Sequence, residues 1–239
     1  MDCFYALPGD ISSSNIILRG DEARHLARVL RRAVGERVFV TDGQDRMFEM
    51  EITAIGPLQT VGVIVAEMPR LHESPLDVTI GVSLLRNPSR FDYLVEKATE
   101  IGVRRIVPLI CDRTIPRSAK VDRYRHLALA AMKQSCRCYL PVIDPPMHLP
   151  EFLAGAGPDA LRVLPHEQAP EDLTIGRLLR TRGGVPRAYL AIGPEGGFSD
   201  EEVSAATQAT WELVRMGSRR LRAETAALVA LTLLLHSAP

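Results

Sequence analysis

The chain is poor in lysine, in cysteine and in long apolar runs, and each shortage argues against a class of protein. Only three of its 29 basic residues are lysines, and 29 acidic residues bring the formal net charge to zero. That balance argues against a uniformly basic nucleic-acid-binding protein. The longest apolar run, 226–235, is interrupted at Thr232, is too short to span a bilayer and predicts a buried helix. The opening residues MDCFYALPGD lack a basic segment followed by an apolar run, so we expect no signal peptide and no membrane segment.

The four cysteines, Cys3, Cys111, Cys136 and Cys138, are irregularly spaced. A structural zinc site needs four ligands, and Cys136 and Cys138 lack a second pair of Cys or His residues. We therefore expect free thiols in a reducing, cytoplasmic compartment, and no metal site.

The common nucleotide-binding and hydrolase motifs are missing as well. No G-x-G-x-x-G follows the first strand of the C-terminal part, and no G-x-x-x-x-G-K-[ST], H-E-x-x-H or G-x-S-x-G occurs. The first two absences argue against a dehydrogenase, a P-loop nucleotidase and a Rossmann-type methyltransferase.

What is present divides the chain into two patterns, of which the first covers residues 1–68. Short apolar strands and one helix predict a small β-barrel there. The expected strands are 15–18, 37–41, 47–55 and 60–66, and the expected helix is capped by Asp21 and runs through Leu30. Asp42-Gly43 is a strong turn dipeptide, so the strands that flank it should form an antiparallel pair. Residues 69–75 are polar and contain two prolines, which predicts a linker.

Residues 76–239 instead alternate strands with helices. This pattern predicts an α/β domain with a parallel sheet that is covered by helices on both faces. The expected strands are 76–85, 105–110, 160–164, 187–192 and 211–215. The expected helices are 89–102, 121–136, one that begins at a capping box formed by Ser199 and Glu202, and the apolar helix near the C-terminus.

Basic residues are concentrated in two places. The predicted helix of the first part carries Arg24, His25, Arg28 and Arg31 at spacings of three and four, which puts several of them on one face. Residues 104–137 contain nine basic residues and only two acidic ones. The guanidinium fork suits phosphates, so both clusters are candidate sites for a polyanion, and a solvated helix face is the alternative.

The most informative stretch is 190–226, where two short apolar runs each lead into a glycine turn. The sequence GPEGG (193–197) follows the first run, and MGS (216–218) follows the second. Parallel strands end at the same edge of a sheet, and glycine turns at that edge let a ligand approach the backbone closely. For either turn alone, a plain connection between strand and helix is the alternative.

The sequences IGPEGGFSDEE (192–202) and MGSRRLRAETA (216–226) resemble those of the small-subunit ribosomal RNA uridine-N3 methyltransferases (RsmE) of the SPOUT superfamily. The upstream segments HLARVLR (25–31) and EKATEIG (96–102) agree with the same family, so the resemblance covers nearly the whole chain. Cys3, Lys133 and Met216 depart from the family's usual arginine, glutamate and leucine, and the change at Cys3 removes one possible RNA contact.

The resemblance implies an N-terminal PUA-like barrel and a C-terminal SPOUT domain that contains a deep trefoil knot. It also implies a homodimer, with 16S rRNA within the small ribosomal subunit as substrate and S-adenosylmethionine (AdoMet) as cofactor. The residues that match the family's cofactor loops are Leu164, Pro165, Ile192, Gly193, Pro194, Glu195, Gly196, Gly197, Met216, Gly217, Arg220, Leu221 and Thr225. The candidate RNA contacts are Arg24, His25, Arg28, Arg31, Lys97, Arg113, Arg123, Gln134 and Arg137.

The catalytic hypothesis concerns the proton on uridine N3, which makes this atom a poor nucleophile. A sulfonium methyl group is already activated, so the enzyme chiefly aligns the reactants. A nearby cation stabilises the uracil anion, and a carboxylate or water accepts the proton. On this chain, Arg222 is the candidate for stabilising the anion, and Glu224 either orients the uracil or acts as the base. The target nucleotide must be unpaired or flipped.

Three other functions stay open on the sequence. The chain could be a SPOUT enzyme that methylates a ribose 2′-hydroxyl or another base nitrogen, although the PUA-like N-terminus and residues 222–225 favour uridine N3. It could be a non-catalytic, RNA-binding ribosome assembly factor that no longer binds AdoMet. A nucleotide-phosphate hydrolase would use GPEGG as an anion loop, but the lysine and metal-binding acids of such an enzyme are missing.

Overall fold

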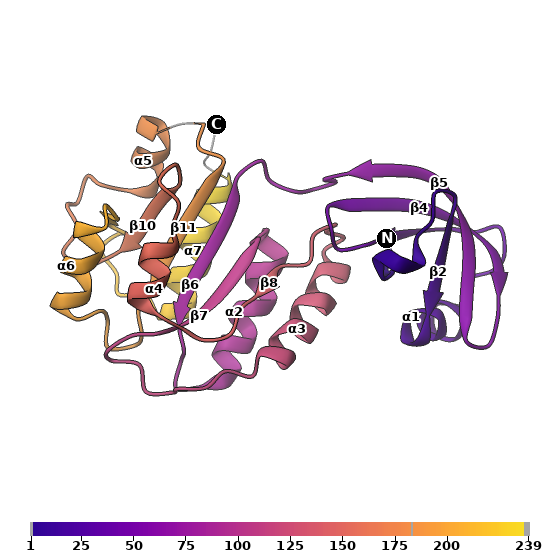
Figure 1. Ribbon diagram of the computed structural model, residues 1–239, viewed down its shortest axis with the longest axis horizontal. Coiled ribbons are helices and arrows are strands. Elements are labelled where there is room, and N and C mark those ends of the chain that lie inside the picture. The colour runs from indigo at the N-terminus through magenta and orange to yellow at the C-terminus, as the bar shows by residue number, and fades with distance from the viewer. Residues whose placement is uncertain (1, 183, 237–239) are drawn as a thin grey trace. The chain divides into compact units, whose positions relative to one another are not determined.

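The computed structural model of the chain describes residues 2–182 and 184–236, and these residues form two compact units (Figure 1). The first unit comprises Met1–Glu73 together with Leu129–Leu140, and the second comprises Ser74–Ala128 together with Pro141–Pro239. The division after Glu73 falls inside the segment 69–75. The sequence does not predict that Leu129–Leu140 belongs with the first unit, because the helical pattern runs on without a break through this point.

The first unit is built on a five-stranded sheet in the order β1-β3-β4-β5-β2. Its strands are β1 (Cys3–Tyr5), β2 (Asn15–Arg19), β3 (Arg37–Thr41), β4 (Arg46–Ile55) and β5 (Gln59–Pro69). β1 runs parallel to β3, and the other neighbouring strands are antiparallel. Alternate side chains point inward, and Phe4, Ile16, Leu18, Phe48 and Met50 form a core inside the sheet.

The predicted hairpin around Asp42-Gly43 is confirmed. β3 and β4 pair antiparallel, with Arg37 opposite Glu51 and Thr41 opposite Met47. Gly43 has φ 69°, a conformation that glycine adopts without strain. The buried Asp42 carboxylate accepts hydrogen bonds from the Gln44 backbone N–H at 2.7 Å and from Arg46 Nε at 2.7 Å. The turn is therefore fixed by its own side chains.

The helical segment of the first unit differs from the prediction at its start. The short turn η1 (Pro8–Asp10) precedes β2, and α1 (Gly20–Arg24) continues into the π-helical turn η2 (His25–Val29). The predicted cap at Asp21 is wrong, since Arg19 occupies the N-cap position and makes no side-chain cap. Gly20 has φ 58°, so the chain turns into the helix before Asp21, whose carboxylate pairs with Arg24 instead.

The second unit is an α/β domain with a parallel sheet, as predicted. The strand order is β12-β10-β11-β6-β7-β8, and β9 pairs with β7. Its strands are β6 (Asp77–Ser83), β7 (Arg105–Ile110), β8 (Val142–Ile143), β9 (Met147–His148), β10 (Leu161–Pro165), β11 (Arg187–Ile192) and β12 (Glu212–Val214). All its strand pairs are parallel. The loops that follow β6, β7, β10, β11 and β12 therefore leave the same edge of the sheet.

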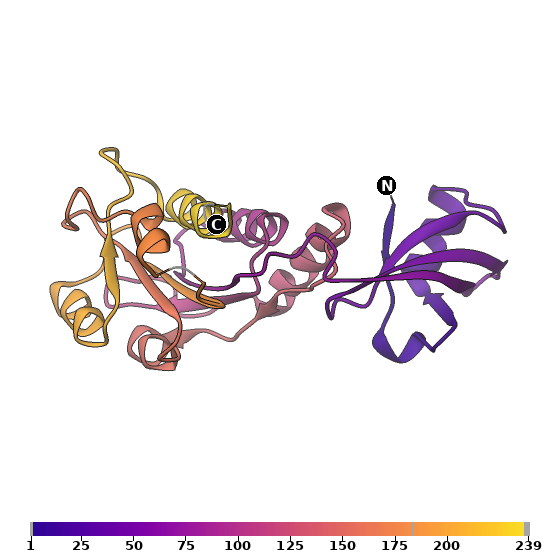
Figure 2. The ribbon, with the colours of Figure 1, turned by 90° about the horizontal axis from the view of Figure 1, so that it is seen from above.

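Helices cover both faces of this sheet, which confirms the layered arrangement predicted for residues 76–239. The helices of the second unit are α2 (Pro88–Ile101), α4 (Leu149–Gly155), α5 (Ile175–Arg182), α6 (Asp200–Gln208) and α7 (Ala223–His236), whereas α3 (Val121–Gln134) is divided between the two units. Figure 2 shows α2 and α7 side by side on one face, and α4 and α6 on the other. Because the sheet is covered twice, Val78, Ile80 and Val82 of β6 are fully buried. The trefoil knot stays a prediction from the resemblance.

No helix among the described residues is long and apolar enough to cross a membrane. The apolar segment near the C-terminus is α7, and seven of its side chains are buried.

Candidate cofactor-binding and catalytic site

A cavity of about 630 Å³ opens in the second unit where β10, β11 and β12 end. The loops that follow these three strands supply most of its wall, which is where ligands bind in open parallel sheets. Its lining residues are Arg90, Arg113, Pro165, His166, Glu167, Ile192, Gly193, Pro194, Glu195, Gly196, Gly197, Phe198, Arg215, Met216, Gly217, Ser218, Arg219, Arg220, Leu221, Arg222, Ala223 and Ala226.

The first wall is the loop GPEGG, whose shape depends on two of its glycines. A Cβ on Gly193 would lie 3.2 Å from the backbone nitrogen of Phe198, so a larger residue would crowd the loop. Gly197 has φ 72°, and its N–H closes a turn on the carbonyl of Pro194 at 2.8 Å. The backbone of this loop is therefore held in a tight turn at the cavity.

Two neighbouring loops hold GPEGG from outside. The backbone N–H of Arg86, which follows β6, donates to Glu195 Oε1 at 3.0 Å. Arg113, which follows β7, donates from Nη1 to the carbonyl oxygen of Gly196 at 2.8 Å. The end of β6 and the end of β7 thus fix the loop after β11.

The predicted capping box begins the helix that follows this loop. Ser199 accepts from the backbone N–H of Glu202, and Glu202 accepts from the backbone N–H of Ser199. Asp112 joins them, because its N–H donates to Glu202 Oε1 at 2.8 Å and its carboxylate accepts from Ser199 Oγ at 2.7 Å. The start of α6 is in this way bound to the loop after β7.

The second wall is the loop after β12. Gly217 has φ 93°, a region that favours glycine, and residues 216–221 line the cavity. The N–H of Arg215 donates to the carbonyl of Leu173 at 2.8 Å, and the N–H of His166 donates to the carbonyl of Val214 at 3.0 Å. These bonds tie the loops after β10 and β12 together.

The cavity wall is rich in arginine. Six arginines line it, against the two acids Glu167 and Glu195. Those arginines are Arg90, Arg113, Arg215, Arg219, Arg220 and Arg222. Arg219, Arg220 and Arg222 are exposed. The rim therefore has an excess of positive charge and favours an anionic ligand.

Most of the residues matched to the cofactor loops come together here, and two do not. Pro165 lines the cavity, but Leu164 is buried in the core beneath it. Thr225 is exposed on α7 and is not part of the lining. The sequence reasoning missed Arg90, and it assigned Arg113 to RNA. Arg113 follows shortly after a predicted strand and Arg90 lies in the first turn of the predicted helix 89–102, so their place at the carboxyl edge of the sheet was the available signal.

The two catalytic candidates are placed differently. Arg222 lines the cavity, whereas Glu224, in the first turn of α7, does not. The Glu224 side chain is only 10% exposed, and its Oε1 lies 3.7 Å from Nε of Arg90. Glu224 is thus next to a cavity residue and not at the cavity surface itself.

Several candidate RNA contacts are already paired with acids. Arg24 pairs with Asp21, and Arg123 pairs with Asp92 at 2.8 Å. Lys97 donates hydrogen bonds to Glu96 and Glu100, which raise the pKa of this lysine above its usual range. His25, Arg28, Arg31 and Gln134 are exposed.

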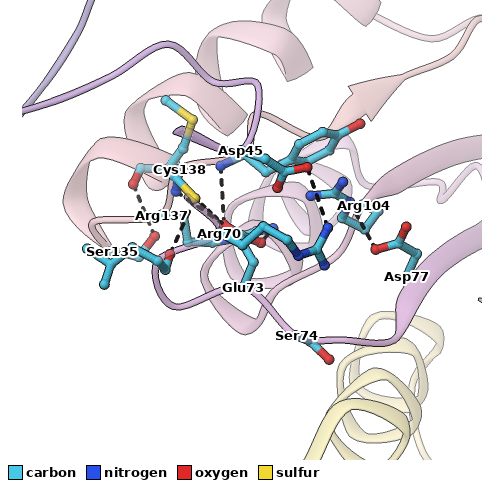
Figure 3. Close-up of polar contacts among 12 residues, drawn as sticks. Asp45, Arg70, Glu73, Ser74, Asp77, Arg104, Ser135, Arg137 and Cys138 are labelled. Atoms are coloured by element: carbon cyan, nitrogen blue, oxygen red, sulfur yellow. Dashed lines mark hydrogen bonds and ion pairs between the residues drawn. The ribbon is translucent and has the colours of Figure 1, made fainter. Parts of the chain in front are cut away.

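The structure argues against the RNA contact predicted for Arg137. Its Nη2 lies 2.6 Å from Glu73 Oε2, and the two side chains are 3% and 1% exposed (Figure 3). Glu73 also accepts from the backbone N–H groups of Cys138 and Tyr139. A guanidinium that is buried against a carboxylate is not available to phosphates, so the placement of Arg137 argues against the predicted RNA contact.

Cys3, Cys111, Cys136 and Cys138, which all lie in the described part of the chain, form no disulfide. Burial raises the pKa of Cys3, Cys111 and Cys138 to about 12. Among the residues that the structure describes, no group of three or more His, Cys, Asp or Glu side chains is arranged to hold a metal ion.

Comparison with known proteins identifies both parts of the chain. The model of an RNA methyltransferase domain matches residues 72–235, and the model of an RNA methyltransferase PUA domain matches residues 18–64. The ribosomal RNA small subunit methyltransferase E of Synechocystis sp. is 31% identical over 229 residues, which are 94% of this chain and 74% of the relative.

Two solved structures are similar over almost their whole length. Ribosomal RNA small subunit methyltransferase E from Neisseria gonorrhoeae, bound to S-adenosylmethionine, has a TM-score of 0.84 and 29% identity over 97% of this chain and 95% of that one. A putative methyltransferase from Legionella pneumophila, in complex with the same cofactor, has a TM-score of 0.80 and 26% identity over 97% and 96%. The cavity, the two glycine loops around it and these matches together show that the chain belongs to the RsmE family of RNA methyltransferases.

Proposed function

We propose that this chain transfers the methyl group of AdoMet to N3 of one uridine in the 16S rRNA of the small ribosomal subunit. The observation that carries the proposal is the cavity formed by GPEGG and by residues 216–221, inside the segment that matches an RNA methyltransferase domain. Relatives named for the ribosomal RNA small subunit, and neighbours with bound cofactor, support the substrate and the cofactor.

The residues present fit AdoMet. A cavity of about 630 Å³ is in the usual range for a ligand of this size. Ile192, Leu221 and Ala226 offer apolar surface for the adenine ring, and the glycine turns leave backbone groups accessible to polar atoms. Glu195 and Arg215 provide charges for the amino and carboxylate groups of the methionine part.

When bound, AdoMet supplies an activated methyl group, so that the bond from N3 to the methyl carbon forms as the carbon–sulfur bond breaks. The chain's own task is to bind and orient the uracil and to stabilise the negative charge that appears when the N3 proton passes to a water molecule. We assign that stabilisation to Arg222, which lines the cavity and carries a permanent positive charge.

The RNA backbone is expected on two surfaces. Arg219 and Arg220 on the cavity rim suit the phosphates that flank a flipped nucleotide. In the PUA-matched part, Arg28 and Arg31 are exposed and suit other phosphates of the RNA. We therefore assign an RNA-binding role to residues 1–68, the linker to 69–75, and catalysis together with the phosphate contacts at the cavity rim to 76–239.

We propose that the enzyme acts as a homodimer in the cytoplasm. Val229 and Leu233 lie four residues apart on α7 and are 39% and 38% exposed, which leaves an apolar stripe on a helix whose other side is buried. A second copy of the chain would cover such a stripe.

The test is methyl transfer from AdoMet to 16S rRNA, either free or in small subunits, followed by reverse transcription. A methyl group at N3 blocks Watson–Crick pairing, so the polymerase should stop at the modified uridine. The Arg222→Ala variant should lose the stop, whereas Arg180→Ala, which changes an exposed arginine of α5, should keep it. Methyl transfer without any stop would indicate a ribose hydroxyl or another atom and would contradict the proposal.

A further inference from the structure

The buried carboxylate of Glu224 is directed at Arg90 and not at the cavity. Glu224 lies in the first turn of α7 and Arg90 in the first turn of α2, two helices that pack against each other. Glu224 Oε1 is 3.7 Å from Arg90 Nε, and Glu224 Oε2 is buried without a hydrogen-bond partner among the described residues. A charged group in such a place needs a countercharge, and Arg90 supplies it.

This arrangement is unfavourable for Glu224 as the base that removes the N3 proton. A general base must come within hydrogen-bond reach of the proton, directly or through one water. Glu224 is not a lining residue of the cavity, and its carboxylate forms an ion pair with Arg90. Its influence on a bound uracil must therefore pass through that arginine.

Arg90, in contrast, reaches the cavity. It lines the same cavity as Arg222, and its side chain is 34% exposed, so the guanidinium is partly open toward the ligand space. An arginine side chain has many rotamers, and an ion pair to a fixed carboxylate selects among them. A carboxylate that is held in the first turn of a packed helix is well suited to this purpose.

We propose that Arg90 is a second arginine that contacts the target uracil, and that Glu224 is the positioning residue that holds Arg90 in place. The inference rests on the proposed function. Loss of the N3 proton leaves negative charge on both O2 and O4 of uracil. Two arginines on different elements, Arg90 on α2 and Arg222 before α7, can each donate hydrogen bonds to one of these oxygens.

The experiment is a double-mutant cycle with Arg90→Ala, Glu224→Gln and the two combined. The measurements are kcat and KM for methyl transfer to 16S rRNA, together with the AdoMet dissociation constant by calorimetry. We expect Arg90→Ala to lower kcat by about 100-fold and Glu224→Gln by about tenfold. The combined variant should be no slower than Arg90→Ala, because Glu224 has no role once Arg90 is gone. AdoMet affinity should stay within about twofold in each variant.

Two further comparisons separate positioning from folding. Arg90→Lys keeps the positive charge and loses the forked guanidinium group, so its kcat should be higher than that of Arg90→Ala. The lysine variant also replaces the alanine variant in the cycle if Arg90→Ala is unstable. The pair Arg182 and Glu212, joined at 3.0 Å outside the cavity, is the control, and Arg182→Ala and Glu212→Gln should leave kcat unchanged.

The outcomes are distinct. Losses that multiply in the combined variant would show that Glu224 acts independently of Arg90, and an unchanged kcat in Arg90→Ala or in Glu224→Gln would equally overturn the inference. If the unmodified protein binds AdoMet but transfers no methyl group to RNA, the proposed function fails, and this inference fails with it.

Discussion

Arg113 donates a 2.8 Å hydrogen bond from Nη1 to the carbonyl oxygen of Gly196, and so joins the loop after β7 to the loop after β11. Gly196 is 83 residues away in sequence. The contact turns an arginine that the sequence assigns to RNA into a support of the cofactor loop.

We expect Arg113→Ala to weaken AdoMet binding by about tenfold, because a hydrogen bond from a charged donor is worth about 1.5–3 kcal/mol. Calorimetry with AdoMet measures the change. Arg117→Ala alters an exposed arginine of the same loop and should leave the affinity unchanged. An Arg113→Ala variant with normal AdoMet affinity but a shallower salt dependence of RNA binding would show that Arg113 contacts RNA phosphates, as the sequence predicts.

Gly217→Ala should destabilise the second glycine loop, since a residue with a Cβ at φ 93° is strained by about 1–3 kcal/mol. Both a lower melting temperature and weaker AdoMet binding should follow. The matched control is Gly155→Ala at the end of α4, where a Cβ meets nothing within 4 Å and φ is not positive. Equal effects of the two substitutions would show that the positive φ of Gly217 is not the cause of the lower melting temperature and the weaker AdoMet binding.

Removal of Arg137 should destabilise the first unit by about 3–5 kcal/mol, because Glu73 would be left as a buried, uncompensated charge. Denaturant unfolding measures this loss. Arg123→Ala breaks a partly exposed pair with Asp92 and should have little effect. A stable Arg137→Ala variant with reduced RNA affinity would contradict our placement of this residue.

The buried cysteines should make stability depend on alkaline pH. Burial raises the pKa of Cys111 and Cys138 to about 12, whereas an unfolded thiol titrates near 8.5. The free energy of unfolding that the neutral, buried thiols contribute is fully present below about pH 8.5. It is lost as the pH rises toward 12, because in that interval the thiols ionise only in the unfolded chain. Urea unfolding at several pH values tests this.

The same thiols should react slowly in the folded protein. At pH 8 about one in ten thousand of them is a thiolate, and the thiolate is the reactive form. Iodoacetamide labelling, read by mass spectrometry with and without urea, should show that Cys111 and Cys138 become reactive only on unfolding. Rapid labelling of the folded chain would contradict their burial.

Local patterns in the sequence were enough to predict most of the helices and strands. Strands β7 and β11 have the predicted bounds, because each is a short apolar run between clear breaks. The Asp42-Gly43 hairpin and the capping box of Ser199 and Glu202 are decided by residues within a few positions of one another, and both formed as predicted.

The remaining elements depend on partners that are distant in sequence. β1, β8 and β9 have two or three residues each, too few for a periodic pattern, and they exist because a neighbouring strand pairs with them. The helix start at Gly20 was misplaced because only the backbone shows its positive φ.

The sequence by itself determined the two-part organisation, the parallel sheet and the glycine turns at 193–197 and 216–218, since each is encoded in neighbouring residues. The tertiary structure alone decided what the charged side chains do. It buried Arg137 against Glu73, turned Arg113 to Gly196 and set Glu224 beside Arg90. A charged residue has the same local signature whether it faces phosphate, carboxylate or water. Its role follows from which distant group the fold brings within about 4 Å.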